Sequence, residues 1–213
     1  MAPKAYGIFS VRNNECFRDH AYLQWGKSEV SLGSCLILHA PTISEKEAVD
    51  RRALSPRQTY ETKQIPLDAT MRQLAAFLTH LHHNQKLNGR LHIYSVLPLQ
   101  CVRPGVPAEY FEFIASETSM SSPLPTAEEL RRHPWLIVSW GTVHRSSWRR
   151  TAAVKNNWLH ALKESGILCF GKKIASKGKY ALYNHVGAIR GKNQADIMKQ
   201  LTSYYNEARN GSL

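Results

Sequence analysis

Residues 34–40 read Ser-Cys-Leu-Ile-Leu-His-Ala, a short apolar run that is ended by Pro41. A strand that is apolar at consecutive positions, instead of at every second one, is typical of a sheet buried on both faces, as parallel sheets are. Three further short, largely apolar runs follow, at 91–97, 135–140 and 167–170, and each is ended by proline or glycine. The chain therefore predicts four strands of one buried sheet.

Segments with helical spacing separate these runs. Met71, Leu74 and Leu78 recur at helical intervals after Asp68, whose side chain is expected to cap the helix. Further helices are predicted at 108–116, 126–132, 147–164 and 193–208. Because strands alternate with helical crossovers, the sequence predicts an α/β fold, a three-layer sandwich with a central, mainly parallel four-stranded sheet.

The chain shows no internal repeat and no Gly/Ser-rich linker, so residues 1–213 are expected to form a single α/β domain. Residues 1–33 contain two short apolar segments and are expected to form an N-terminal cover, either as a strand pair or as irregular chain. Residues 42–67 are polar and basic, with two prolines, and are expected to form a long lid loop.

The charge of the chain is its most informative bulk property. It has 28 Lys and Arg against 16 Asp and Glu, a formal net charge of +12. Such an excess favours a polyanionic partner. The basic residues are dispersed in pairs, without the polybasic tail that an anionic membrane surface would favour, so DNA is the expected partner and no membrane association is expected. A monomer is expected.

Several chemistries are disfavoured. The chain has no phosphate-binding P-loop, no Gly-x-Gly-x-x-Gly after the first strand, no Gly-x-Ser-x-Gly elbow and few acidic residues for a two-metal site. His80 and His83 could share a metal, but with no carboxylate nearby an exposed polar helix face is favoured. No metal or cofactor is expected. Cys35 and Cys169 lie in apolar runs and are interpreted as reduced thiols of a cytoplasmic protein.

Five short segments, taken in order, carry a resemblance: Leu36-Ile-Leu-His-Ala-Pro-Thr42, Asp68-Ala-Thr-Met-Arg72, Ile93-Tyr-Ser-Val-Leu-Pro-Leu99, Leu136-Ile-Val-Ser-Trp-Gly141, and Cys169-Phe-Gly-Lys172 with Gly178–Tyr183. They resemble a family of bacterial and phage proteins known as domain of unknown function 1643, and their order is also similar to that of the uracil-DNA glycosylase superfamily. The resemblance spans roughly residues 34–186.

The resemblance implies a glycosylase-like fold and a metal-independent DNA glycosylase, which flips a base out of double-stranded DNA and hydrolyses its N-glycosidic bond. The sequence departs from the family at two points. Ala40, preceded by His39, stands where the superfamily has Asn or Asp before a proline, and either Tyr180-Ala181 or Asn184-His185 stands near the place of its late His-Pro pair. By analogy with similar phage-defence glycosylases, the expected substrate is a modified base such as glucosylated hydroxymethylcytosine.

Candidate site residues lie where the predicted strands end, since ligands of such sheets bind beyond their carboxyl ends. Asp68 is the candidate catalytic carboxylate, His39 the group that stabilises the departing base, and His185 a residue that closes the pocket. The base pocket is expected to include Pro41, Thr42, Ser95, Trp140 and Tyr180. The phosphate-binding residues are expected to be Arg51, Arg52, Arg145, Arg149, Arg150, Lys172 and Lys173.

Each of these residues also has a structural interpretation. Asp68 would be a plain helix cap, His39 a partly buried polar ring and Trp140 a core residue. Two other functions stay open: a non-catalytic nucleic-acid-binding protein with a glycosylase-like fold, favoured by the departures from the family pattern, and an enzyme acting on nucleotides or sugars in which the charge is incidental.

Overall fold

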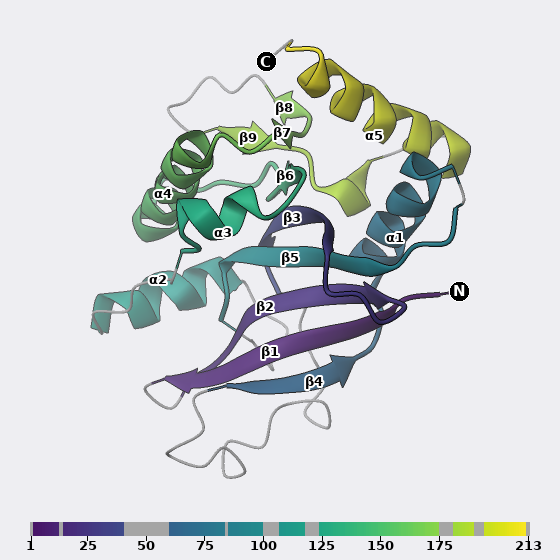
Figure 1. Cartoon of the computed structure of the whole chain (residues 1–213). Helices are drawn as coiled ribbons and strands as arrows, with labels where there is room; N and C mark the ends of the chain where they lie inside the picture. The colour runs from purple at the N-terminus through teal and green to yellow at the C-terminus, as the bar shows by residue number, and fades with distance from the viewer. Residues whose placement is uncertain are drawn as a thin grey trace.

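The computed structural model describes residues 2–12, 15–40, 60–83, 85–99, 107–117, 124–174, 181–189 and 194–211. Its centre is a seven-stranded sheet with the order β4-β1-β2-β5-β3-β6-β7 (Figure 1). The strands are β1 (Lys4–Arg12), β2 (Glu15–Trp25), β3 (Ser31–His39), β4 (Glu61–Ile65), β5 (Gly89–Leu97), β6 (Leu136–Ser139) and β7 (Cys169–Phe170).

The α/β class is confirmed, and so are the four strands predicted from apolar runs, which lie side by side as β5, β3, β6 and β7. All three pairings among them are parallel. The prediction of a mainly parallel, four-stranded sheet is wrong, because three antiparallel strands extend the sheet beyond β5 and make it mixed. These strands face the core with only one side, so they alternate between buried and partly exposed residues and show no continuous apolar run.

Two segments therefore differ from their expected roles. Residues 1–33 do not merely cover the sheet, because they contribute β1, β2 and part of β3 to it. The lid predicted for 42–67 contains the edge strand β4, while its residues 42–59 lie outside the described residues. The β4 sequence Glu-Thr-Lys-Gln-Ile is polar, and it is held by backbone pairing with β1, so its composition gave no strand signal.

The helices are close to their predicted positions. They are α1 (Ala69–Leu81), α2 (Pro107–Glu117), α3 (Ala127–Arg131), α4 (Arg149–Ser165) and α5 (Gln194–Arg209). Thr126 and Glu129 form the reciprocal capping box that starts α3, with both hydrogen bonds present. Within the described chain, none of these helices has the length and apolarity that a bilayer span requires.

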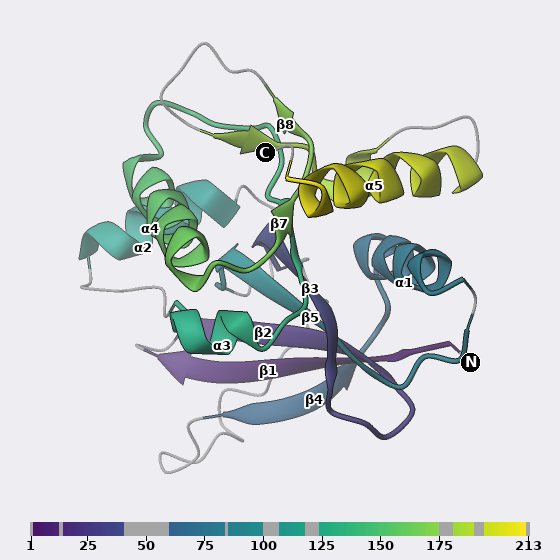
Figure 2. The same ribbon diagram turned by 45° about the horizontal axis from the view of Figure 1, so that its top comes forward.

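The helices form a layer on each side of the sheet (Figure 2). On one side, α1 and α5 pack against a core that includes Phe77, Trp135 and Leu201. On the other, α2, α3 and α4 enclose Leu130, Trp140 and Trp158. These three helices lie over the parallel strands, and no described helix crosses the front of β1 and β2 in the view of Figure 1.

A small second sheet and a short turn complete the carboxyl-terminal part of the fold. The strands β8 (Lys173–Ile174) and β9 (Leu182–Tyr183) pair antiparallel, and the 3-10 helix η1 (Val186–Ala188) follows. The hydroxyl of Ser139, at the end of β6, accepts a hydrogen bond of 2.6 Å from the Val186 amide. Because this bond is buried, it fixes η1 against the edge where the parallel strands end.

Candidate active site

The three candidate catalytic residues come from distant parts of the chain and meet at one edge of the sheet. His39 is the last residue of β3, Asp68 is the N-cap of α1, and His185 is the N-cap of η1. Burial lowers the pKa of His185, the charge of His39 lowers it further, and the carboxylate of Asp68 raises it. The two groups are thus close enough to His185 for their charges to act on it.

Asp68 is a helix cap, as its structural interpretation expected. Its Oδ1 accepts a hydrogen bond of 2.8 Å from the Met71 amide, and its extended backbone, with ψ of 177°, is typical of a cap. This bond involves one of the two carboxylate oxygens. The cap fixes the position of the carboxylate at the sheet edge, so the structural role and a chemical role are compatible.

The hydrogen bonds of the two histidines set opposite tautomers. His39 Nδ1 lies 3.0 Å from the carbonyl oxygen of Ala40, which can only accept, so Nδ1 carries the proton and Nε2 has a free lone pair. His185 Nδ1 accepts a hydrogen bond of 3.1 Å from the Gly187 amide, so in the neutral ring the proton is on Nε2. The site therefore holds one imidazole that can accept a proton and one that can donate a hydrogen bond.

Arg18, in β2, is a site residue that the sequence reasoning missed. Only 3% of it is exposed, and its Nη2 has no hydrogen-bond partner among the described residues. Burial lowers the pKa of its guanidinium to about 10, and the nearby charge of Asp68 acts in the opposite direction. A buried cation that lacks a full set of partners beside a carboxylate is suited to an anionic ligand.

A β-bulge aims Arg18 at this site. Ile8 pairs with His20, whereas the next residue, Phe9, pairs with Arg18, so Asp19 is an extra residue in β2. The bulge changes the alternation of β2, and Arg18 then lies beside Gly7, where a Cβ would come within 3.3 Å of Arg18 Cδ. Without the bulge, strand alternation would put Arg18 on the same face as His20. No apolar pattern predicts a strand at Arg18, so the sequence carried no signal for this orientation.

Cys35, in β3, connects this edge to the core. The residue is fully buried, burial raises the pKa of its thiol, and a hydrogen bond with Ser139 acts the other way. It is a free cysteine, as is Cys169 within the described part of the chain. A thiol held in its neutral form is a packing group here.

The predicted base pocket is only partly described. Pro41, Thr42 and Tyr180 lie outside the described residues. Ser95 is buried inside β5, where it pairs with Ile37 of β3. Trp140 is 1% exposed, its Nε1 donates to the Ala181 carbonyl at 3.1 Å, and its ring meets Tyr183 edge to face. The structure therefore supports the interpretation of Trp140 as a core residue, not as an open stacking surface.

The predicted phosphate-binding residues that are described follow the carboxyl ends of β6 and β7. They are exposed: Arg145, Arg149, Arg150, Lys172 and Lys173. Arg51 and Arg52 lie outside the described residues. Arg145 forms an ion pair of 2.7 Å with Glu109. The amides at the N-terminus of α4 already have an anionic partner, because the carboxylate of Glu112 accepts hydrogen bonds from the Arg150 and Thr151 amides.

A metal site would need several ligand side chains close together. Among the described residues, no three His, Cys, Asp or Glu side chains form a group that could hold a metal ion. His80 lies in the last turn of α1, and His83 follows the helix with a positive φ of 51°.

Comparison of the chain with protein-family models, with curated proteins and with solved structures found no match.

Proposed function

We propose that this protein is a DNA glycosylase that hydrolyses the N-glycosidic bond of a modified base after flipping the nucleotide out of the duplex. One observation carries the proposal: Asp68, His39 and His185, from three separate segments, lie at the edge where the parallel strands end. The turn η1 that follows His185 is bonded to Ser139, which pairs with Ile37 of β3 near His39. A Cβ at Gly187 would lie 3.2 Å from His185 Nδ1 and 3.3 Å from Oγ1 of Thr70, two residues after Asp68. An edge of this kind is where ligands of α/β sheets bind. In this proposal the parallel half of the sheet positions the catalytic residues, as the sheet of a glycosylase does.

The three residues can divide the chemistry among them. Water adds to C1′ of the sugar, and the electron pair of the C1′–N bond leaves with the base. The tautomers change the roles expected from the sequence for the two histidines. His39 Nε2 accepts the proton of the water instead of stabilising the departing base, and the Nε2–H of His185 takes over that role by donating a hydrogen bond to the base as negative charge develops on it. The Asp68 carboxylate stabilises the positive charge that develops on the sugar. The proton finally passes to the base, so the products are a free base and an abasic site.

Arg18 and the exposed cations have a different role in this proposal. A buried guanidinium would oppose positive charge on the sugar, so Arg18 is better suited to bind a phosphate of the flipped nucleotide. The side chains of Arg149, Arg150, Lys172 and Lys173 would contact other phosphates along the same edge. Binding should therefore weaken steeply as salt is raised.

The test is an excision assay with an Asp68→Asn variant. DNAs with different base modifications, glucosylated hydroxymethylcytosine first, are incubated with the protein and assayed for alkali-labile abasic sites. Asn is as good a helix cap as Asp, so the variant should keep its fold. We expect at least about 100-fold slower excision, in the range of a lost electrostatic or acid–base group, and nearly unchanged DNA binding. Full activity of the variant would remove Asp68 from the mechanism.

A non-catalytic nucleic-acid-binding protein is the second candidate, and one observation favours it. Asp68 already has a complete structural role as the cap of α1. If no modified DNA yields abasic sites while tight, salt-sensitive binding is retained, this second function replaces the first. If DNA affinity is absent even at low salt, both are wrong.

A further inference from the structure

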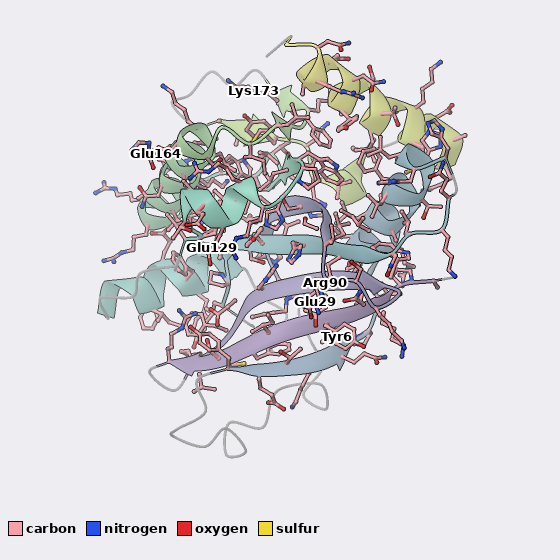
Figure 3. The ribbon with its side chains drawn as sticks, in the orientation of Figure 1. Tyr6, Glu29, Arg90, Glu129, Glu164 and Lys173 are labelled. Carbon is pink, nitrogen blue, oxygen red and sulfur yellow. The ribbon has the colours of Figure 1, made fainter. Side chains whose placement is uncertain are left out.

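A cavity of about 650 Å³ opens on the sheet face that α1 and α5 do not cover. Its lining includes His20 of β2, His92 and Tyr94 of β5, Ser31 and His133. Ser31 is the first residue of β3, whereas His39 is the last, so the cavity lies toward the opposite end of this strand from the candidate active site. Figure 3 shows Glu129 on α3, and Glu29 and Arg90 along the front of the sheet, around this region.

The cavity is lined by rings that stack on one another. The ring of His20 lies parallel to that of Tyr94, with centroids 4.7 Å apart and an interplanar angle of 5°. The ring of His20 is also nearly coplanar with that of His92, with centroids 4.9 Å apart and an interplanar angle of 19°, and the two rings meet edge to edge. His133 lies 4.7 Å from His92 and is tilted toward it. Such rows of rings across neighbouring strands provide flat surfaces on which a further planar ring can stack.

Hydrogen bonds fix the rings and leave a defined pair of nitrogens. His133 is held on both sides, by Tyr94 Oη at 2.7 Å and by Ser31 Oγ at 2.8 Å. His20 Nε2 and His92 Nδ1 are 3.0 Å apart, so one of them donates to the other. Whichever of the two donates, the remaining nitrogens, His20 Nδ1 and His92 Nε2, provide one donor and one acceptor.

The histidines of the cavity are uncharged at neutral pH. Burial is the main cause: it lowers the pKa of His20 and His133 to about 4 and that of His92 to about 3. Neutral rings do not attract phosphate by charge. The same rings were found not to form a metal-binding group within the described residues.

Two carboxylates at the rim are neutralised by arginines. Glu29 forms an ion pair of 2.5 Å with Arg90, and Asp19 forms one with Arg12. The Arg90 guanidinium also lies 4.6 Å from the centre of the Tyr22 ring. The third carboxylate of the lining, Glu129, accepts a hydrogen bond from the Thr126 amide, and Arg132 also lines the cavity, so the charges of the lining do not select a cationic ligand.

We propose that this cavity binds an unpaired nucleobase of a single-stranded nucleic-acid segment, by stacking on the His20–Tyr94–His92 rings and by a donor–acceptor pair of hydrogen bonds to its edge. A nucleobase is planar and neutral, and its edge carries both donor and acceptor atoms, which complement the one donor and one acceptor that His20 Nδ1 and His92 Nε2 provide. The size of the cavity is in the range of ligand pockets. The inference does not depend on the proposed excision, because it concerns a different region and binding alone.

The experiment compares two probes that carry the same phosphates. One is a fluorescein-labelled single-stranded oligonucleotide of thymidines, and the other is the same chain built from abasic residues. Titration of the full-length protein measures the affinity for each. We expect the thymidine chain to bind about 5- to 150-fold more tightly, the range for stacking one base on an aromatic platform. Equal affinity for the two chains would overturn the proposal, because charge alone would explain binding.

Variants locate the effect in the cavity. His92→Phe keeps a ring and removes the nitrogens, so it should lower the preference for the base-bearing chain in part, and His92→Leu should lower it further. The control is His160→Phe, an exposed histidine of α4 that lies outside the cavity lining. An unchanged preference in both His92 variants would contradict the proposal, whether or not the protein excises bases.

A measurement on the unaltered protein covers the case in which a His92 variant does not fold. Addition of the thymidine chain should shift the ring nitrogen and carbon resonances of His20 and His92 in NMR spectra, and those of the exposed His160 should stay in place. Shifts confined to residues away from the cavity would overturn the proposal.

Discussion

The two histidine groups of this molecule are held in different ways. At the carboxyl edge of the parallel strands, His39 and His185 are each oriented by one main-chain hydrogen bond and lie near the charge of Asp68. On the open sheet face, His20 and His92 are oriented by each other, in a stack of uncharged rings. The first arrangement fixes which ring nitrogens carry protons, whereas the second provides a surface on which a planar ring can stack.

The environment of an imidazole decides which chemistry it can take part in. A ring whose tautomer is fixed beside a carboxylate is equipped for proton transfer, and a ring that is desolvated among other rings is equipped for stacking and hydrogen bonding. Four experiments test this distinction, and they follow in order of decreasing expected effect.

The largest effect is expected for His39→Gln. Glutamine can keep a hydrogen bond to the Ala40 carbonyl but cannot accept a proton from water, so excision should slow by about 100-fold or more. Single-turnover measurement of abasic-site formation tests this. His160→Gln, an exposed position on α4, is the matched control and should retain the full rate. Equal rates for His39→Gln and the unaltered protein would show that this ring is not the base.

The next largest effect is expected on the free energy of unfolding at acidic pH, through the three histidines of the cavity. Because the folded-state pKa values of His20, His92 and His133 lie near 3–4, below the 6.5 of an ordinary histidine, the unfolded chain binds more protons between these values. Their contribution to stability is therefore complete above pH 6.5 and is lost as the pH falls toward 4. We expect a loss of roughly 2–4 kcal/mol between pH 7 and pH 5, measured by urea unfolding.

A double variant, His20→Phe with His92→Phe, serves as the control for this pH dependence. It keeps two rings in the stack and removes two of the titrating groups, so the free energy of unfolding should vary much less between pH 7 and pH 5. A slope that stays the same in the double variant would assign the acid sensitivity to other groups.

A smaller effect is expected for Gly7→Ala, which tests the packing that positions Arg18. An alanine Cβ would lie 2.7 Å from Cε2 of the Phe9 ring and 3.3 Å from Arg18 Cδ, so both side chains must move. We expect a loss of about 1–2 kcal/mol in the free energy of unfolding, together with weaker binding of DNA. Unchanged stability in denaturant titrations would show that the region around the bulge has spare room.

The smallest effect is expected for single exposed cations. Arg149→Gln should reduce the slope of log affinity against log salt by about one unit if its side chain contacts a phosphate. Lys86→Gln is the matched control, since Lys86 is exposed shortly before Gly89, where β5 begins, at the opposite edge of the parallel strands. A change of slope in the control alone would place the DNA on that opposite edge.

The sequence predicted the parallel half of the sheet better than the antiparallel half, for a physical reason. Strands buried on both faces must be apolar at nearly every position, and β3, β5, β6 and β7 carry that signal directly. That signal is continuous in β3 and β6, whereas β5 alternates from Gly89 to Ser95 because His92 and Tyr94 face the cavity. The edge strand β4 is held by backbone hydrogen bonds to β1, which leave no trace in its polar composition. Helix starts were predictable as well, because the caps Asp68 and Thr126 act locally.

What the sequence determined by itself is local: which segments are apolar, where helices begin, and that the chain carries a large excess of positive charge. The tertiary structure decided which side chains meet. Asp68, His39 and His185 are brought together by the crossovers, and Arg18 is turned toward Asp68 by one extra residue in β2. The stack of His20, His92 and Tyr94 likewise depends on strand register, which is fixed by long-range pairing that no local pattern encodes.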